Sequence, residues 1–450
     1  MVRVSRALKL DCHKTVILWG GPEVSYNAKR RLDENACLSA VLCGEGEIAL
    51  PRTLRQLEAN EEMRGPGVVT RLSDGGIAPL MDAEQWIDVY KEETHLDPHR
   101  LWYLETVRGC PYGCRYCLSS AIAGLRALDA QEAIKRLLHL RDAGAAIIKL
   151  VDRTFNFDRA RARAIWRALL EKGQGATYHF EIAANLLEQE DIDLLSAAPE
   201  GLFQLEIGVQ TTTRAALLEV GRTLEFEKIA WAVEQLCRRT HVPVHMDLIA
   251  GLPQDSLDSF ASSFDDVLAL RPNRLQLGFL KLLHGSALRQ DFDAGAGVYS
   301  PDAPYEVIAT GQMSYRDLSL LKDVEEVVET FYNTHAFPAT QAMYLTCFAD
   351  FVSVAERLRD NGFFAEGQGE LARFSHLFSA LKPRCGEEAL LENCLRYDWL
   401  HDKKRLVRPD FMDDEQPEMQ QMLRARCDSV TQRRHRQVER FLYDVHTGQR

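Results

Sequence analysis

The middle of the chain alternates short apolar runs with longer amphipathic stretches at a regular interval. Helical spacing fills the stretches, as in the stripe of Phe226, Ile229, Val233 and Leu236. Six strand–helix units predict a parallel sheet that curves toward a barrel, so we expect an α/β fold with a partial (βα)6, TIM-like barrel. The six apolar runs, each typical of a buried strand, cover residues 101–107, 146–152, 177–183, 202–209, 242–250 and 274–280.

The two flanks of this core have other patterns. Residues 1–77 hold apolar runs at 15–21 and 38–47 that end in glycine turns, and a helical stretch at 50–60. The pattern is Rossmann-like but too short for a complete doubly wound domain. We expect a partial α/β region at 1–77, a linker at 78–100, a barrel core at 101–300, and a helical domain at 301–450 whose last helix covers 416–443.

Charge and composition narrow the partners and the cellular compartment expected for this chain. It has 450 residues and a formal net charge of −12, and such an acidic balance argues against nucleic acid as a partner. No apolar run is long enough to cross a bilayer, and the first residues lack the apolar core of a secretory signal. We therefore expect a cytoplasmic protein with no membrane partner, in which cysteines bind metal rather than form disulfides.

Three cysteines directly after the first expected barrel strand form the clearest chemical motif. In RGCPYGCRYC, Cys110, Cys114 and Cys117 have the spacing C-x3-C-x2-C. Three thiolates on one loop can bind three corners of a 4Fe–4S cube and leave the fourth iron free for a cofactor or substrate. A structural zinc would need a fourth ligand, and none is spaced to match nearby in the sequence. The motif favours the cluster, with a zinc site or a chance spacing as the alternatives.

This motif resembles the signature of the radical S-adenosylmethionine (SAM) superfamily, C-x3-C-x-aromatic-C, with Tyr116 in the aromatic position. The resemblance implies that Tyr116 packs near the adenine of SAM and that the free iron chelates the amino and carboxylate groups of SAM. It also implies reductive cleavage of SAM to methionine and a 5′-deoxyadenosyl radical, which abstracts a hydrogen atom from the substrate.

Polar residues near the later strand ends resemble those of the coproporphyrinogen-dehydrogenase-like branch of this superfamily. By that resemblance, Glu181, Gln210 and Asp247 contact the ribose or amino-acid part of SAM, and Arg222 contacts its carboxylate. A lone charged residue at a strand end is more often a surface or capping group, but four at successive strand ends point to a ligand. Where the superfamily often has a Gly-Gly-Glu turn, this chain has VDRTFN, so Asp152 is the candidate replacement.

The first region resembles the second half of a cobalamin-binding domain, through WGGPEVSY at 19–26 and GEGE at 44–47. That domain commonly precedes the barrel in one large radical SAM branch, and a subfamily of that branch carries a helical carboxyl-terminal domain of unassigned function. The first half of such a domain is absent, so we expect that the start of the chain is lost or that the domain has degenerated. Cobalamin binding stays open.

The sequence thus predicts a radical SAM enzyme with a 4Fe–4S cluster, SAM and an unknown, small-molecule substrate. The resemblance implies an electron donor such as flavodoxin or ferredoxin. With cobalamin we expect a transferase that moves a methyl group; without it, an oxidoreductase. The alternatives are a zinc-binding interaction protein and an inactive, truncated product. No residue is assigned a catalytic role by the sequence.

Overall fold

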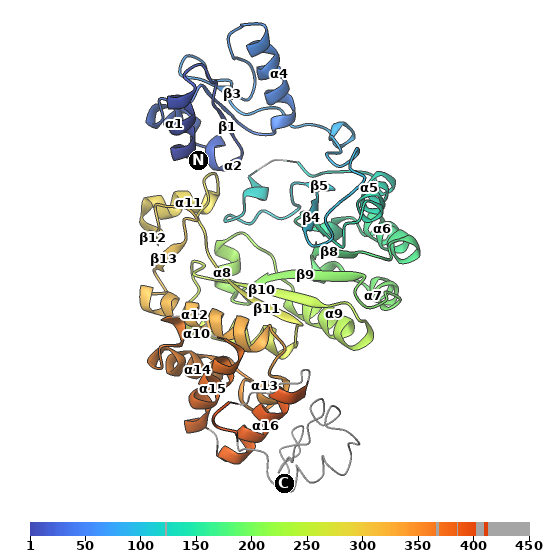
Figure 1. The fold of residues 1–450 in the computed structure, drawn as a ribbon, viewed down its shortest axis with the longest axis vertical. Helices are drawn as coiled ribbons and strands as arrows, with labels where there is room; N and C mark the ends of the chain where they lie inside the picture. The colour runs from blue at the N-terminus through green and yellow to red at the C-terminus, as the bar shows by residue number, and fades with distance from the viewer. Residues whose placement is uncertain (122–123, 366–368, 385, 402–408, 413–450) are drawn as a thin grey trace, which may run out of the picture.

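The computed structural model describes residues 1–121, 124–365, 369–384, 386–401 and 409–412. Along its longest axis the chain passes from an N-terminal α/β region through a central sheet to a group of helices (Figure 1). The helix expected at 416–443 lies outside the described residues. Within them, no helix combines the length and apolarity needed to cross a membrane.

The central sheet has six parallel strands in the order β11-β10-β9-β8-β7-β4. Each strand overlaps one of the six expected runs, so the α/β fold with a partial barrel is confirmed. The chain moves one position along the sheet at each crossover, which is what right-handed strand–helix units produce. The strands are β4 (Leu101–Leu104), β7 (Ile147–Leu150), β8 (Thr177–Ile182), β9 (Phe203–Gln210), β10 (Val244–Ala250) and β11 (Arg274–Phe279).

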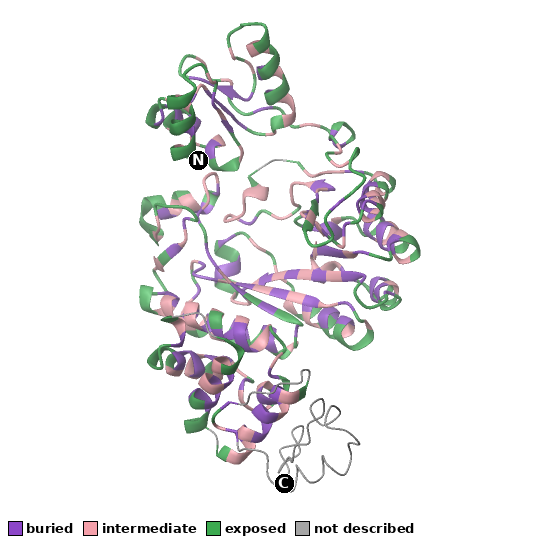
Figure 2. Cartoon of the chain, viewed as in Figure 1, coloured by how far each residue is buried: buried purple, intermediate pink, exposed green. Residues whose placement is uncertain are grey.

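Helices cover the outer face of this sheet, and they bury one side of every strand. Phe155, Trp166, Phe180 and Phe203 meet in this layer, with ring centroids of Phe155 and Phe180 4.4 Å apart. Figure 2 shows the resulting alternation of buried and partly buried positions along β9 and β10. The helices are α5 (Ala130–Asp142), α6 (Arg159–Lys172), α7 (Gln189–Ser196), α8 (Arg214–Glu219), α9 (Phe226–Arg239) and α10 (Leu257–Ala269).

The N-terminal region is a small three-stranded sheet flanked by helices. Strands β1 and β2 are parallel, and β3 joins β2 antiparallel, so the sheet is the Rossmann-like fragment that the pattern indicated. Helix α4 begins four residues earlier than expected, directly after the glycine turn. Its elements are α1 (Val2–Asp11), β1 (Leu18–Gly20), α2 (Pro22–Ser25), α3 (Ala28–Glu34), β2 (Ala40–Leu42), α4 (Gly46–Glu58) and β3 (Val68–Val69).

A hairpin that the sequence pattern did not indicate joins the barrel to the last helices. Its strands, β12 (Gly297–Tyr299) and β13 (Val307–Thr310), lie on both sides of the expected domain boundary at 300/301. The helices after it share one continuous apolar core with the barrel. They are α12 (Tyr315–Val327), α13 (Pro338–Tyr344), α14 (Phe348–Asp360), α15 (Glu370–Leu381) and α16 (Glu388–His401), and α11 (Ala287–Asp291) precedes the hairpin.

Candidate functional site

The loop that carries the three cysteines is closed at its base by a short antiparallel pair, β5 (Val107–Arg108) with β6 (Arg126–Ala127). Gly109 follows β5 with φ +90°, and a Cβ there would come within 2.6 Å of the carbonyl oxygen of Gly124. Only glycine fits this left-handed, crowded position. The base of the loop is therefore tight, and we call it the neck.

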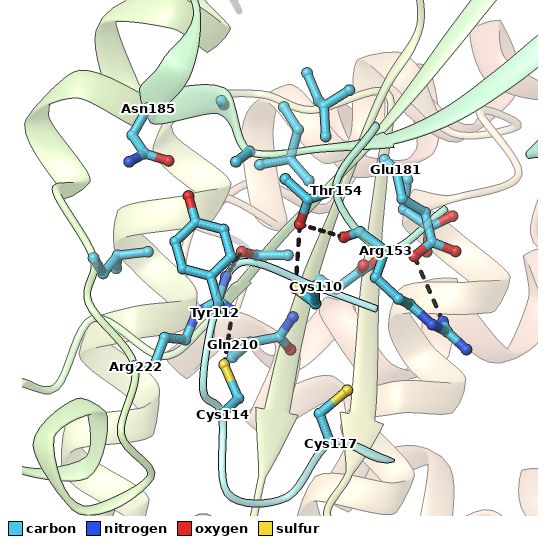
Figure 3. Close-up of a pocket in the computed structure, with 18 of the residues that line it drawn as sticks. Cys110, Tyr112, Cys114, Cys117, Arg153, Thr154, Glu181, Asn185, Gln210 and Arg222 are labelled. Atoms are coloured by element: carbon cyan, nitrogen blue, oxygen red, sulfur yellow. Dashed lines mark hydrogen bonds and ion pairs between the residues drawn. The ribbon is translucent and has the colours of Figure 1, made fainter. Parts of the chain in front are cut away.

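Cys110, Cys114 and Cys117 line one cavity, with Cys114 buried and the other two partly buried (Figure 3). The Ser120 hydroxyl donates to the carbonyl oxygens of Cys114 and Cys117, at 2.7 Å each, and fixes the loop between them. In the described residues, no three His, Cys, Asp or Glu side chains surround one point as zinc ligands do. A 4Fe–4S cluster binds each thiolate to a different iron, so a shared cavity is what its ligands require.

Arg115, inside the cysteine loop, anchors the loop to the far side of the barrel. Its backbone N–H donates to the carbonyl of Val220 at 2.9 Å, and its guanidinium forms ion pairs with Asp291 at 2.6 Å and Glu219 at 3.3 Å. The loop is thus held at its neck and again near its middle, which restricts where the thiols can point.

The structure brings Glu181, Gln210, Arg222 and Asp247 to the cavity of the three cysteines, together with Tyr116. Three of their atoms are buried and have no hydrogen-bond partner among the described residues, so they can bind a ligand or water. These atoms are Gln210 Oε1, Arg222 Nε and Asp247 Oδ1. The arrangement offers acceptors and a cation to one ligand and thiols to a cluster beside it, so the donor set fits SAM and 4Fe–4S.

Arg222 and Gln210 both lie at the carboxyl end of β9. Arg222 donates through Nη2 to the carbonyl oxygen of Gly208 at 2.5 Å, and its Nη1 lies 3.5 Å from Cys114 Sγ. Gln210 ends β9 with φ +73°, a conformation that turns the chain sharply at the strand end. A Cβ at Gly208 would lie 2.3 Å from Gln210 Nε2, so glycine there leaves room for the amide.

Asp152 is not brought to this cavity. It is fully buried, and its carboxylate accepts hydrogen bonds from the backbone N–H groups of Thr106 and Val107 at 2.7 and 2.9 Å, and from the Thr106 hydroxyl. Burial raises the pKa of Asp152 to about 6, although these bonds act against the rise. Its place in the structure is beneath β5, where it holds the start of the cysteine loop.

The cavity is also lined by residues that the sequence did not single out, among them Tyr112, Arg153, Thr154, Asn185 and Glu206. Thr154 Oγ1 lies 3.5 Å from Cys110 Sγ, and Arg153 forms an ion pair with Glu181 at 3.6 Å. Figure 3 shows Arg153 and Glu181 side by side at one margin of the cavity. The alternation in FQLEIGVQ could have identified Glu206, because it lies on the same face of the strand as Gln210.

The inner face of the sheet next to the cavity is polar, whereas most barrel interiors are packed with branched apolar side chains. Glu206 Oε2 lies 2.7 Å from Lys149 Nζ and 2.8 Å from His179 Nε2. His245, opposite Glu206 in the sheet register, contacts Gln204 at 2.6 Å. We call these five residues the inner polar layer. It offers charged and hydrogen-bonding groups at the side of the cavity away from the cysteines.

Burial and mutual charge shift the pKa values of this face in opposite directions. Burial, together with the charges of Glu206 and Glu181, raises the pKa of Asp247 to about 8. Burial favours neutral Glu206 as well, but hydrogen bonds from His179 and Lys149 outweigh it and lower the pKa of Glu206 to about 2. At neutral pH without a ligand, Asp247 is therefore protonated beside an ionised Glu206.

A second cavity, of about 640 Å³, lies between the N-terminal region and the barrel. Gly44, Glu45 and Glu47 line it from one side, and Ser119 and Ala121 of the cysteine loop line it from the other. Arg153 borders both cavities, so the two spaces adjoin at its side chain.

Two segments of the chain match the profiles of known protein families. The profile of the radical SAM superfamily matches residues 104–267, and that of DUF4080, a family of unknown function, matches residues 296–448. The anaerobic coproporphyrinogen III oxidase 1 of Cereibacter sphaeroides is 30% identical over 100 residues, 22% of either chain.

Two solved structures have a similar fold. TsrM of Kitasatospora setae, a radical SAM methyltransferase solved with tryptophan and a SAM analogue, has a TM-score of 0.55 at 16% identity, over 66% of this chain and 62% of TsrM. OxsB, a cobalamin-dependent SAM radical enzyme, has a TM-score of 0.50 at 14% identity, over 97% of this chain and 76% of OxsB. This chain spans less than two thirds of the oxidase and of TsrM. Residues 104–267 thus match a radical SAM domain, and such a domain implies a 4Fe–4S cluster and SAM as cofactors.

Proposed function

We propose that this chain cleaves SAM reductively and abstracts a hydrogen atom from a small-molecule substrate. In this proposal Cys110, Cys114 and Cys117 would hold a 4Fe–4S cluster, and Arg222 and Gln210, which line the same cavity, would bind SAM. The observation that carries the proposal is the set of three unpartnered, buried polar atoms in the cavity of the thiols.

Four residues of the cavity bind SAM in this proposal. The Arg222 guanidinium, held by the Gly208 carbonyl, binds the SAM carboxylate, while Gln210 and Asp247 accept hydrogen bonds from its ribose or ammonium group. Glu181 lies next to Arg153 at the margin of the cavity and completes the pocket for the ribose. When bound and reduced, the cluster supplies the electron that splits SAM into methionine and the 5′-deoxyadenosyl radical.

The substrate lies against the inner polar layer in this proposal. That layer joins the cavity through Glu206, whose carboxylate is held by Lys149 and His179. Covering these charged groups with an apolar substrate would cost their remaining hydration, so we expect a substrate rich in hydrogen-bonding groups. An external reductant such as flavodoxin or ferredoxin is needed, because the chain's other residues carry no electron source of their own in this proposal.

Anaerobic reconstitution with iron and sulfide tests the proposal directly. The protein should turn brown, bind about four irons per chain, and form 5′-deoxyadenosine from SAM when dithionite is added. Cys114→Ala should lose this activity, whereas Cys12→Ala, a change of an exposed cysteine on the first helix boundary, should keep it. Colourless protein with one tightly bound zinc would support the alternative of a zinc-binding interaction protein.

A second candidate function, methyl transfer through cobalamin, is favoured by the cavity between the N-terminal region and the barrel. This cavity has room for a large ligand and adjoins the proposed SAM pocket at Arg153. Its N-terminal wall includes the GEGE segment that resembles cobalamin-binding domains. OxsB, whose fold is similar over most of this chain, is itself cobalamin-dependent.

Hydroxocobalamin is the probe for this second function. It should co-elute with the protein in gel filtration, and Ala121→Trp, which narrows the cavity from the loop side, should weaken its binding by at least tenfold. Leu72→Trp, at an exposed position away from the cavity, is the matched control. No retention of cobalamin by the wild-type chain would leave a radical oxidoreductase without cobalamin as the function.

A further inference from the structure

A compact group of charges joins the N-terminal region to the neck of the cysteine loop. Glu45, in the turn before α4, forms ion pairs with Arg108 at 3.1 Å and with Arg126 at 2.6 Å. Glu47, two residues further along in the first turn of α4, contacts Arg108 at 2.5 Å. The Trp86 ring lies 4.5 Å from the Arg108 guanidinium and covers the group from one side.

Arg108 is the last residue of β5 and Arg126 is the first residue of β6, the two strands that form the neck. Arg108 and Arg126 are direct partners in the antiparallel register of β5 and β6. Like charges directly opposite each other destabilise such a pair. The strands are only two residues long, so few other hydrogen bonds compensate for that repulsion.

Glu45 lies where its carboxylate can offset both arginines at once. Its Oε1 faces Arg126 Nη2 and its Oε2 faces Arg108 Nη1, and it also accepts a hydrogen bond from the backbone N–H of Met81 at 3.1 Å. The side chains of Glu45, Arg108 and Arg126 are 12%, 18% and 14% exposed, so solvent and salt screen this group little.

We propose that Glu45 is a positioning residue: by neutralising the facing pair Arg108 and Arg126, it keeps the neck closed and the three cysteines in place. The N-terminal region thereby controls the geometry of the cysteine loop through one carboxylate. Glu45 also lines the cavity between the two regions, so a ligand in that cavity touches the group that closes the neck. This role of Glu45 applies to the loop of the apo protein, and only the iron-release and EPR measurements rest on the proposed cluster.

Amide hydrogen exchange of the apo protein is the first test. Glu45→Gln keeps the shape of the side chain and removes its charge, so exchange at the backbone amides of Arg108 and Arg126, the pair that faces across the neck, should accelerate by about tenfold. Glu58→Gln, at the exposed end of the same helix, is the matched control and should leave the neck unchanged. Unchanged exchange at the neck in Glu45→Gln would overturn the proposal.

A second substitution separates charge neutralisation from simple packing. In the double variant Glu45→Gln with Arg126→Gln, only one arginine remains at the neck and the repulsion is gone. Exchange at the backbone amide of Arg108 should return to within about threefold of the wild-type rate. An additive loss of protection in the double variant would show that Glu45 acts by packing alone, and would contradict the proposal. Should Glu45→Gln fail to fold, Glu47→Gln weakens the same group through Arg108 alone and should show a smaller effect of the same sign.

The reconstituted protein gives the readout that links the neck to the cysteines. Glu45→Gln should release iron to a chelator about tenfold faster than Glu58→Gln, and its EPR spectrum with SAM should change, with both properties restored in the double variant. If the wild-type chain takes up no cluster, the proposed function fails, and the exchange experiment alone decides the role of Glu45. Equal iron release in Glu45→Gln and Glu58→Gln would overturn the link to the cysteines.

Discussion

The barrel and the N-terminal region keep their shape by different means. The barrel shares one continuous apolar core with the helices that follow it, and large rings such as Trp166 and Phe180 are fully buried in it. The N-terminal sheet has two small apolar clusters, of nine and five buried residues, on its opposite faces. It meets the barrel through charged and polar contacts, among them Glu45 with Arg126 and Glu23 with Tyr305.

The barrel is therefore the more rigid support of the cysteine loop, and the N-terminal region is the support that opens more easily. A large core fixes the strand ends that carry Gln210 and Asp247, because moving them would open the packing of the whole sheet. A small sheet held by a few charged contacts opens at a lower free energy than the barrel. The cysteine loop lies between the two, with its anchor at Arg115 on the barrel and its neck against the N-terminal region (Figure 1).

The largest effect is expected in the barrel core. Phe180→Ala removes a ring that packs on Phe155, Trp166 and Phe203, and should lower the free energy of unfolding by about 3–5 kcal/mol. Urea unfolding followed by circular dichroism measures it. Phe180→Leu keeps most of the volume and should lose about 1.5 kcal/mol. A loss below about 1 kcal/mol in Phe180→Ala would mean that this layer is not the rigid support.

The second largest effect on stability is expected at the neck of the cysteine loop. Gly109→Ala forces a side chain into a left-handed conformation and against the carbonyl of Gly124, so about 2 kcal/mol of local stability should be lost. Iron content after reconstitution should fall to background while circular dichroism stays normal. Gly113→Ala, in the same loop with open space around it, is the control and should retain iron. Full iron content in Gly109→Ala would show that the neck tolerates opening.

A smaller effect is expected within the N-terminal region. The Arg71 guanidinium donates to the backbone carbonyls of Leu32, Asn35 and Leu38, at 2.6 to 2.9 Å, and so caps the end of α3. Arg71→Ala should destabilise this region by about 1 kcal/mol and leave the barrel unchanged. Hydrogen exchange should accelerate in α3 only, with Lys29→Ala as the control. Faster exchange throughout the barrel would show that the two regions unfold together.

The last effect depends on pH and tests the inner face of the barrel. Asp247 has its pKa raised to about 8 in the folded protein, so it holds a proton that the unfolded chain has already released. This group therefore lowers the free energy of unfolding as pH rises from about 4 to about 8, and adds no further loss above that. Asp247→Asn should therefore gain stability relative to wild type progressively as the pH rises through this window. A constant difference between the two proteins from pH 5 to pH 8 would contradict the raised pKa.

The sequence determined the parts of this protein that depend on local pattern. Apolar runs of strand length at a regular interval fixed the six barrel strands, because each needs one buried face and one crossover helix. The spacing of Cys110, Cys114 and Cys117 placed three thiols on one loop, and the pattern placed Gln210 at the end of β9, although Asp247 lies in the middle of β10 rather than at a strand end. Such features follow from neighbours along the chain, so one sequence suffices to find them.

Tertiary structure alone decided the rest, because it depends on residues far apart in sequence. Asp152 follows the second strand, at the position expected for a SAM contact. Its carboxylate instead accepts hydrogen bonds from the backbone N–H groups of Thr106 and Val107 and is buried. The inner polar layer arises only when several strands bring their inward faces together. The contact of Glu45 with Arg126 spans 81 positions, and no local pattern reports which charges will meet across that distance.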